Sequence, residues 1–123
     1  MRWEAINSSL TPDPDLVAAL TADETALPAA QVLAHYVIHG DFFDPETQHL
    51  DGIDRIRDPP AVIIQGRYDL CCSPATAYDL ARHWPEATLN IIADAGHSSM
   101  EPGITDQLVR APDRFADRLH QHG

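Results

Sequence analysis

The chain has 123 residues, and its 19 acidic against 8 basic side chains give a formal net charge of −11. This length is typical of a single domain with its own core. So acidic a chain would repel nucleic-acid phosphates and anionic lipid, and we expect neither as a partner. No apolar run approaches the roughly 20 residues of a membrane span, and residues 1–10 lack the pattern of a signal peptide, so we expect a soluble cytoplasmic protein.

The cysteines, glycines and histidines give no cofactor motif. Cys71 and Cys72 are adjacent, and a disulfide between neighbours would be strained. There is no Cys-x-x-Cys pair for zinc and no glycine-rich phosphate loop. His35 and His39 lie four residues apart on a predicted helix, but no third ligand has suitable spacing. We therefore expect no metal and no cofactor.

The first half of the chain reads as short helices separated by prolines. Helices are predicted around residues 3–10, from 14 onward, over 27–40 and within 44–58. Asp13 and Asp44 are the expected N-caps of the second and fourth helices. In the third helix Pro28 lies near the predicted start, and Gly40 is the expected stop. The pair Pro59–Pro60 ends the last helix and marks a boundary between two halves.

The second half alternates strands and helices. Strands are predicted over 61–65 and 87–93, and helices over 73–85 and 101–123. The first strand is a β-branched run without alternation, which is typical of a strand buried on both faces of a parallel sheet. Ser73 is the expected N-cap of the first helix, and Pro112 is expected to bend or restart the second. This order predicts an α/β fold with two parallel strands and crossover helices.

An acid and a base follow the two predicted strands. Asp69 comes just after the first strand, and His97 comes just after the second. The carboxyl ends of parallel strands face the same way, so we expect these side chains to meet within about 2.6 to 3.2 Å. In a hydrolytic triad a carboxylate accepts the Nδ1 hydrogen of an imidazole and stabilises the imidazolium that forms. The alternative is that both residues are ordinary polar residues of turns.

Residues 60–116 resemble the end of a proline iminopeptidase, a serine-type aminopeptidase of the α/β-hydrolase fold that releases N-terminal proline. The motifs that carry this resemblance are "GRYD" at 66–69, "AGHS" at 95–98 with "EPG" at 101–103, and "LVRA" ahead of "DRFA". Upstream, "HYVIHGDFFD" and "RWEA" resemble parts of the family's helical cap. The resemblance implies a partial cap over residues 1–58, followed by the C-terminal part of an α/β-hydrolase core over 59–123.

The same resemblance implies roles for individual residues. Asp69 is similar to the triad acid, His97 to the general base, and Glu4 to a cap carboxylate that holds the free amine of the substrate. Two positions depart from the family pattern. Ser73 stands where a proline usually follows the cysteine matched by Cys72, and Leu33 stands where a second amine-binding glutamate is expected. The implied partner is a peptide with an N-terminal proline.

The 123 residues contain no Gly-x-Ser-x-Gly nucleophile elbow and no upstream oxyanion-hole glycines. Ser8, Ser9, Ser98 and Ser99 lack the flanking glycines of an elbow. Cys72 could be imagined as a nucleophile activated by His97, but a packed, inert cysteine is the preferred interpretation.

We therefore expect the C-terminal fragment of a longer serine peptidase, inactive alone, that self-associates or pairs with an N-terminal hydrolase half. The alternatives are a non-catalytic interaction or complementation module and a soluble α/β domain without catalysis.

Overall fold

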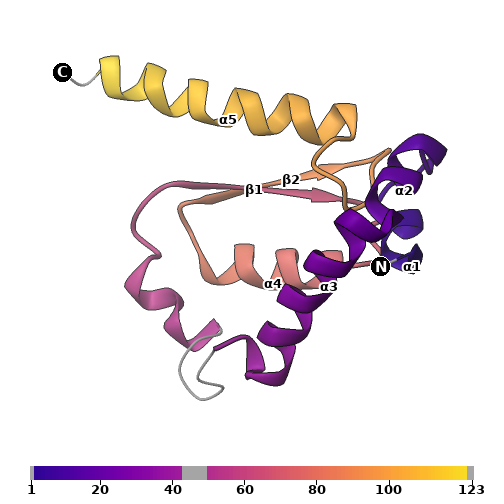
Figure 1. Cartoon of the computed structure of the whole chain (residues 1–123). Coiled ribbons are helices and arrows are strands. Elements are labelled where there is room, and N and C mark those ends of the chain that lie inside the picture. The colour runs from indigo at the N-terminus through magenta and orange to yellow at the C-terminus, as the bar shows by residue number, and fades with distance from the viewer. Residues whose placement is uncertain (1, 43–49, 122–123) are drawn as a thin grey trace.

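The sheet is formed by two parallel strands, β1 (Ala61–Gly66) and β2 (Ala87–Ile92). The computed structural model describes residues 2–42 and 50–121. Helix α4 (Pro74–His83) connects the strands and lies along one face of the sheet, while α5 (Pro102–Gln121) lies along the other (Figure 1). The predicted order of strand, helix, strand and helix is confirmed.

The sheet is less buried than its sequence predicts. Residues 61–65 of β1 were expected to be buried on both faces, but all five are only half-buried. The reason is that β1 has one strand neighbour, β2, within the described residues. The core of the described chain is small, and its buried hydrophobic side chains are Ile53, Ala77, Ala95, Ile104 and Ala111.

Two predicted helix caps are present. The Ser73 hydroxyl accepts a hydrogen bond from the Ala75 N–H at 3.3 Å, with Pro74 at the first position of α4. A carboxylate oxygen of Asp13 accepts the N–H groups of Asp15 and Leu16 at the start of α2 (Pro14–Thr21). These contacts satisfy backbone donors that have no partner within the first helical turn.

The N-terminal helices gather beside the carboxyl ends of the strands. Figure 1 shows α1 (Arg2–Asn7) and α2 next to the arrowheads of β1 and β2, with α3 (Asp23–Ile38) running away from them. The predicted start of α3 near Pro28 is wrong, because the helix begins at Asp23 and Pro28 lies inside it. The predicted stop is present, since Gly40 follows the C-cap with φ of 60°, where glycine is favoured.

The predictions for residues 44–58 and for Pro112 have different outcomes. Asp44, the predicted cap of residues 44–58, lies outside the described residues. The described part of that segment forms a 3₁₀ helix, Leu50–Arg55, in place of α-helical turns. Helix α5 continues through Pro112 without a restart. Within the ranges that the structure describes, no helix has the length and apolar character needed to cross a bilayer.

Candidate active site

The loops that follow β1 and β2 are joined by backbone hydrogen bonds. The N–H of Arg67 donates to the carbonyl of Ile92 at 2.9 Å, and that of Tyr68 donates to the carbonyl of Ala95 at 3.0 Å. These bonds extend the parallel pairing beyond the strands. They bring the residue after Tyr68, which is Asp69, to the loop that carries His97.

A glycine permits this close approach. Gly66 is the last residue of β1, and a Cβ atom placed on it would lie 1.8 Å from the carbonyl oxygen of Gly96 and 2.7 Å from that of Ala95. No side chain fits at such distances. Gly66 therefore lets the loop that carries His97 lie directly against the end of β1, the strand that precedes Asp69.

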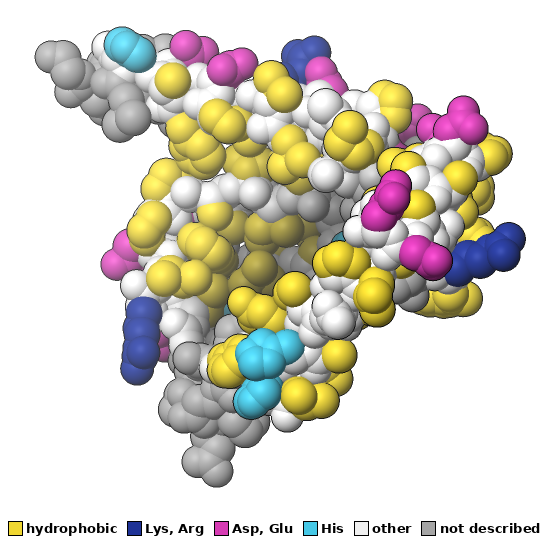
Figure 2. Space-filling model, in the orientation of Figure 1, with side chains coloured by type: hydrophobic (Ala, Val, Ile, Leu, Met, Phe, Trp, Pro, Cys, Tyr) yellow, Lys and Arg dark blue, Asp and Glu magenta, His cyan; other side chains and the backbone are white. Residues whose placement is uncertain are grey.

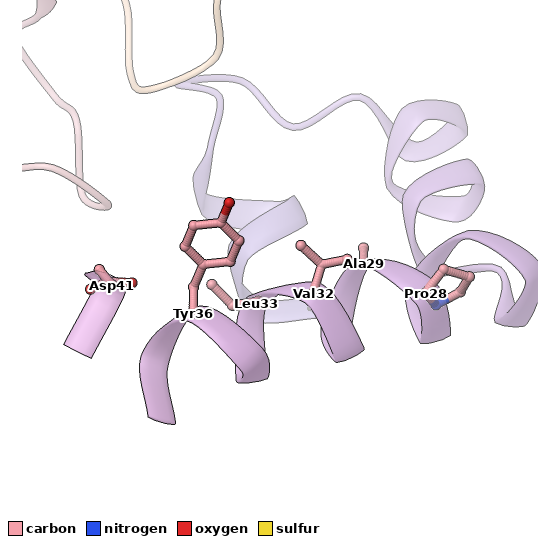
Figure 3. A pocket seen from close by; sticks show the side chains of 6 residues that line it. All are labelled: Pro28, Ala29, Val32, Leu33, Tyr36 and Asp41. Carbon is pink, nitrogen blue, oxygen red and sulfur yellow. The ribbon is translucent and has the colours of Figure 1, made fainter. Parts of the chain in front are cut away.

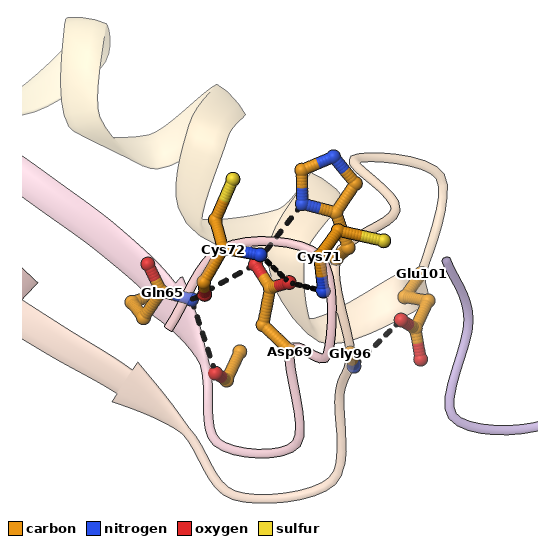
Figure 4. A network of polar contacts seen from close by, with 8 residues as sticks. Gln65, Asp69, Cys71, Cys72, Gly96 and Glu101 are labelled. Atoms are coloured by element: carbon orange, nitrogen blue, oxygen red, sulfur yellow. Dashed lines mark hydrogen bonds and ion pairs between the residues drawn. The ribbon is translucent and has the colours of Figure 1, made fainter. Parts of the chain in front are cut away.

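Asp69 is held by a dense set of hydrogen bonds (Figure 4). Its Oδ1 atom accepts the backbone N–H groups of Cys71 at 2.9 Å and Cys72 at 2.7 Å. Its Oδ2 atom accepts the side-chain amide of Gln65 at 2.9 Å. The residue is only 8% exposed. Its carboxylate is consequently fixed in position before any substrate binds.

The contact predicted between acid and base is present. Nδ1 of His97 lies 3.0 Å from Oδ2 of Asp69. An ionised carboxylate can only accept hydrogen bonds, so Nδ1 must carry the hydrogen and Nε2 of the neutral ring is left as a proton acceptor. The side chain of His97 is 43% exposed, whereas that of Asp69 is 6% exposed. The imidazole of His97 is thus far more exposed than the carboxylate beside it.

The surroundings of Asp69 favour its charged form. Burial alone would raise the pKa of its carboxyl group, but the hydrogen bonds from Cys72, His97 and Gln65 outweigh burial and hold the pKa below its ordinary value. A carboxylate that stays ionised at neutral pH can stabilise a positively charged imidazole beside it.

This lowered pKa predicts a pH-dependent contribution to stability. Asp69→Asn should reduce the free energy of unfolding at pH 7 by roughly 1.5 to 3 kcal/mol, the range for hydrogen bonds to a charged group. The folded pKa lies below the unfolded value of about 3.9, so this stabilisation is complete above that value and is lost as the pH falls through the folded pKa.

Urea unfolding of the chain and the variant, at neutral pH and at about pH 2, measures the effect. Asp106→Asn is the matched control, because Asp106 pairs with Arg110 on the exposed surface of α5 and should change stability by less than about 0.5 kcal/mol. An equal loss in Asp69→Asn at both pH values would contradict the prediction.

Glu4 lines a pocket beside the base. The pocket has a volume of about 280 Å³, and its lining residues are Glu4, Ala5, Ser8, Leu20, Cys71 and His97. The structure therefore brings together three residue positions that sequence reasoning singled out for acid, base and amine binding, since Asp69 contacts His97 directly. The side chains of Glu4 and His97 thus line the same pocket.

Leu33 lies in a different pocket. It is 47% exposed on α3 and lines a hollow of about 590 Å³ together with Val32, Tyr36 and others (Figure 3). Leu33 is not among the residues that line the pocket of Glu4. The idea that this position serves the substrate amine therefore stays a prediction.

Comparison with known proteins places these features in a family context. The chain is 44% identical over 114 residues to proline iminopeptidase of Xanthomonas citri, covering 93% of this chain and 36% of the relative. It is 41% identical over 114 residues to that of Arabidopsis thaliana, covering 93% and 30%. For Neisseria gonorrhoeae the values are 37% over 94 residues, covering 76% and 30%. The chain is homologous to a portion of the proline iminopeptidases.

The chain thus spans about a third of the length of these proline iminopeptidases. No family model matches it. Its mixed architecture, with two parallel strands and covering helices, matches part of this α/β-hydrolase family. The resemblance to proline iminopeptidases stated from the motifs is therefore confirmed for a portion of the enzyme.

Two serines near the base, Ser8 and Ser98, make local hydrogen bonds. The hydroxyl of Ser8 donates to the carbonyl of Ala5, and that of Ser98 accepts the N–H of Met100. Among the hydrogen bonds of the described residues, none joins a serine hydroxyl to His97. The expectation that no serine in the chain acts as the nucleophile stays a prediction.

The expectation of a packed cysteine is wrong. Both Cys71 and Cys72 are exposed. The reason lies in the turn after β1, where both backbone N–H groups point inward to the carboxylate of Asp69. The turn thereby uses its inner side for backbone donors, and both cysteine residues remain exposed.

Sequence reasoning missed the contacts that hold the base. The carbonyl of Ser8 accepts the N–H of His97 at 2.7 Å. Glu101 accepts the N–H of Gly96 at 2.7 Å through Oε1 and that of Leu10 at 3.2 Å through Oε2. The position of Glu101, four residues after His97 in the quoted motif, is the signal that could have suggested such a role. These contacts tie the loop of the base to the segment between α1 and α2.

Proposed function

We propose that the chain supplies the acid and the general base of a serine-type aminopeptidase that releases N-terminal proline from peptides. Asp69 is the acid, His97 is the base, and Glu4 binds the free amine of the substrate. The nucleophilic serine and the oxyanion hole come from a segment outside these 123 residues. Residues 1–58 act as part of the cap, and residues 59–123 as part of the hydrolase core.

One observation carries this proposal. A buried carboxylate lies 3.0 Å from Nδ1 of a half-exposed imidazole, in a chain that is homologous to proline iminopeptidases. The geometry suits general base catalysis, because the nitrogen that faces away from the acid is the one that must accept a proton. The nearby carboxylate of Glu4 lines the same pocket as the base.

The residues act in a defined order in the proposed reaction. Nε2 of His97 takes the proton of the incoming serine hydroxyl as the oxygen attacks the carbonyl carbon of the N-terminal proline. Asp69 stabilises the imidazolium that results. His97 then gives the proton to the leaving amine, and it later activates the water that hydrolyses the acyl enzyme. Glu4 contributes a charge-assisted contact to the secondary ammonium of the substrate.

Co-expression tests this proposal. The chain is produced together with the remainder of the Xanthomonas citri enzyme, meaning the part that this chain does not match. Prolyl-amide cleavage is then measured for the pair and for each partner alone. We expect activity only in the pair, because neither partner holds a nucleophile, a base and an oxyanion hole together.

Two controls decide how the result is interpreted. The pair should cleave an amide with a free N-terminal proline faster than one with a blocked amine, as Glu4 requires. A folded, stable pair without any cleavage would overturn the proposal and favour a non-catalytic interaction or complementation module.

A further inference from the structure

The proposed reaction leaves the thiol of Cys71 without a role. Cys71 follows Asp69 by two residues, and it lines the same pocket as His97. The carboxylate oxygen of Asp69, the sulfur of Cys71 and a ring nitrogen of His97 all lie within 4.8 Å of one another. The described residues therefore bring three different metal-ligating groups to one place, although the spacing of these residues in the sequence matches no metal motif.

These three groups match the ligand preferences of zinc. Zinc binds thiolate sulfur, imidazole nitrogen and carboxylate oxygen, and it commonly keeps a water as the fourth ligand of an open site. Its bond lengths place the ligand atoms of a tetrahedral site about 3.3 to 3.8 Å apart. The ligand atoms lie within 4.8 Å of one another, so the required adjustment is at most about 1.0 to 1.5 Å. Cys71 is exposed, so its thiol can make that adjustment by rotating about one side-chain bond.

The thiol lies among negatively charged groups. Glu4 lines the same pocket as Cys71, and the carboxylate of Asp69 belongs to the same cluster of ligand atoms. A divalent cation neutralises part of this negative charge, and a coordinating thiol loses its proton to the solvent.

We propose that Asp69, Cys71 and His97 form a binding site for Zn²⁺, with water as the remaining ligand. On metal binding, the coordinating ring nitrogen of His97 gives up its hydrogen bond to Asp69, and the neutral ring carries its hydrogen on the other nitrogen. The bound metal thus takes the same carboxylate and imidazole that the proposed general base requires. Metal binding and general base catalysis therefore exclude each other at this site, and Zn²⁺ acts as a reversible inhibitor of any enzyme that uses this acid and base.

Cobalt substitution tests the site directly in the purified 123-residue chain. Co²⁺ is titrated into the wild type, and the near-ultraviolet charge-transfer band between thiolate and cobalt is recorded. Cys71→Ser should lose the band and bind Co²⁺ at least about tenfold more weakly, since even outer partners of a metal site change affinity by about 10- to 100-fold. Cys72→Ser is the matched control and should retain the band and an affinity within about twofold. Excess Zn²⁺ should abolish the wild-type band by displacing Co²⁺.

A second variant guards against a folding defect. His97→Asn should weaken Co²⁺ binding at least about tenfold while the far-ultraviolet circular dichroism stays that of the wild type. A band that survives in Cys71→Ser, or that is lost equally in Cys72→Ser, would overturn the proposal. Metal binding does not depend on peptidase activity, so this test separates the zinc site from the proposed function.

Discussion

Replacing His97 by alanine should lower the rate of prolyl-amide cleavage by the co-expressed pair by about 10⁴-fold or more. Nε2 of the imidazole faces away from Asp69 and is free to accept a proton. Among the described residues, the only other side chain hydrogen-bonded to that carboxylate is the amide of Gln65, which is not a base. Without the imidazole, the serine hydroxyl keeps its proton and the leaving amine receives none. The measurement is kcat for a prolyl amide, with wild-type and variant pairs purified in the same way.

His83→Ala is the matched control for this loss. His83 is an exposed histidine at the end of α4, and its Nδ1 atom contacts the carbonyl of Asp79 within the same helix. The control variant should keep kcat within about twofold, because surface substitutions away from the site change little. Equal losses in both variants would contradict the role given to His97.

The exposed sheet should make the chain associate with itself when it is produced alone. β1 pairs with β2 along one edge, and the described residues place no strand on its other edge. A groove of about 520 Å³ lies between β1 and α5, and its lining residues are Val62, Ile64, Leu108, Ala111, Pro112, Phe115 and Ala116. Figure 2 shows hydrophobic side chains gathered along α5 and in the hollow beneath it. An uncovered strand edge beside apolar surface recruits another chain.

Light scattering after size-exclusion chromatography measures this effect. The chain alone should elute as oligomers with a low soluble yield, and co-expression with the remainder of the Xanthomonas citri enzyme should raise that yield by about tenfold or more, because the partner covers the edge and the groove. Ile64→Lys should reduce self-association without the partner, since a charge on an edge strand opposes pairing. A chain that elutes as a monomer, with a soluble yield unchanged by the partner, would contradict this prediction.

The sequence predicted the contact between Asp69 and His97 and the helix cap at Ser73, because local sequence patterns determine the strands, the helix and the cap. The strands before Asp69 and His97 are short apolar runs, and a crossover through α4 lays them parallel, so the two side chains were expected to meet at one edge of the sheet. The cap at Ser73 followed from residue type alone.

The contacts that hold the loop of His97, and the exposure of the cysteines, depend on tertiary structure that no local sequence pattern encodes. Glu101 reaches Leu10 across 91 positions of the chain, and the carbonyl of Ser8 holds the backbone of His97. A backbone carbonyl acts irrespective of its side chain, so the sequence carries no signal for it. The exposure of Cys72 likewise follows from the direction in which the turn presents its N–H groups to Asp69.

Labelling with a serine-directed fluorophosphonate probe tests the central claim most directly. The probe reacts with a serine hydroxyl only when a neighbouring base activates it. In the co-expressed pair, we expect the label on the partner polypeptide, and we expect it to disappear in the His97→Ala variant of this chain. Label on a residue of this chain, or label on the partner that is unchanged when His97 is replaced, would contradict the assignment of acid and base to Asp69 and His97.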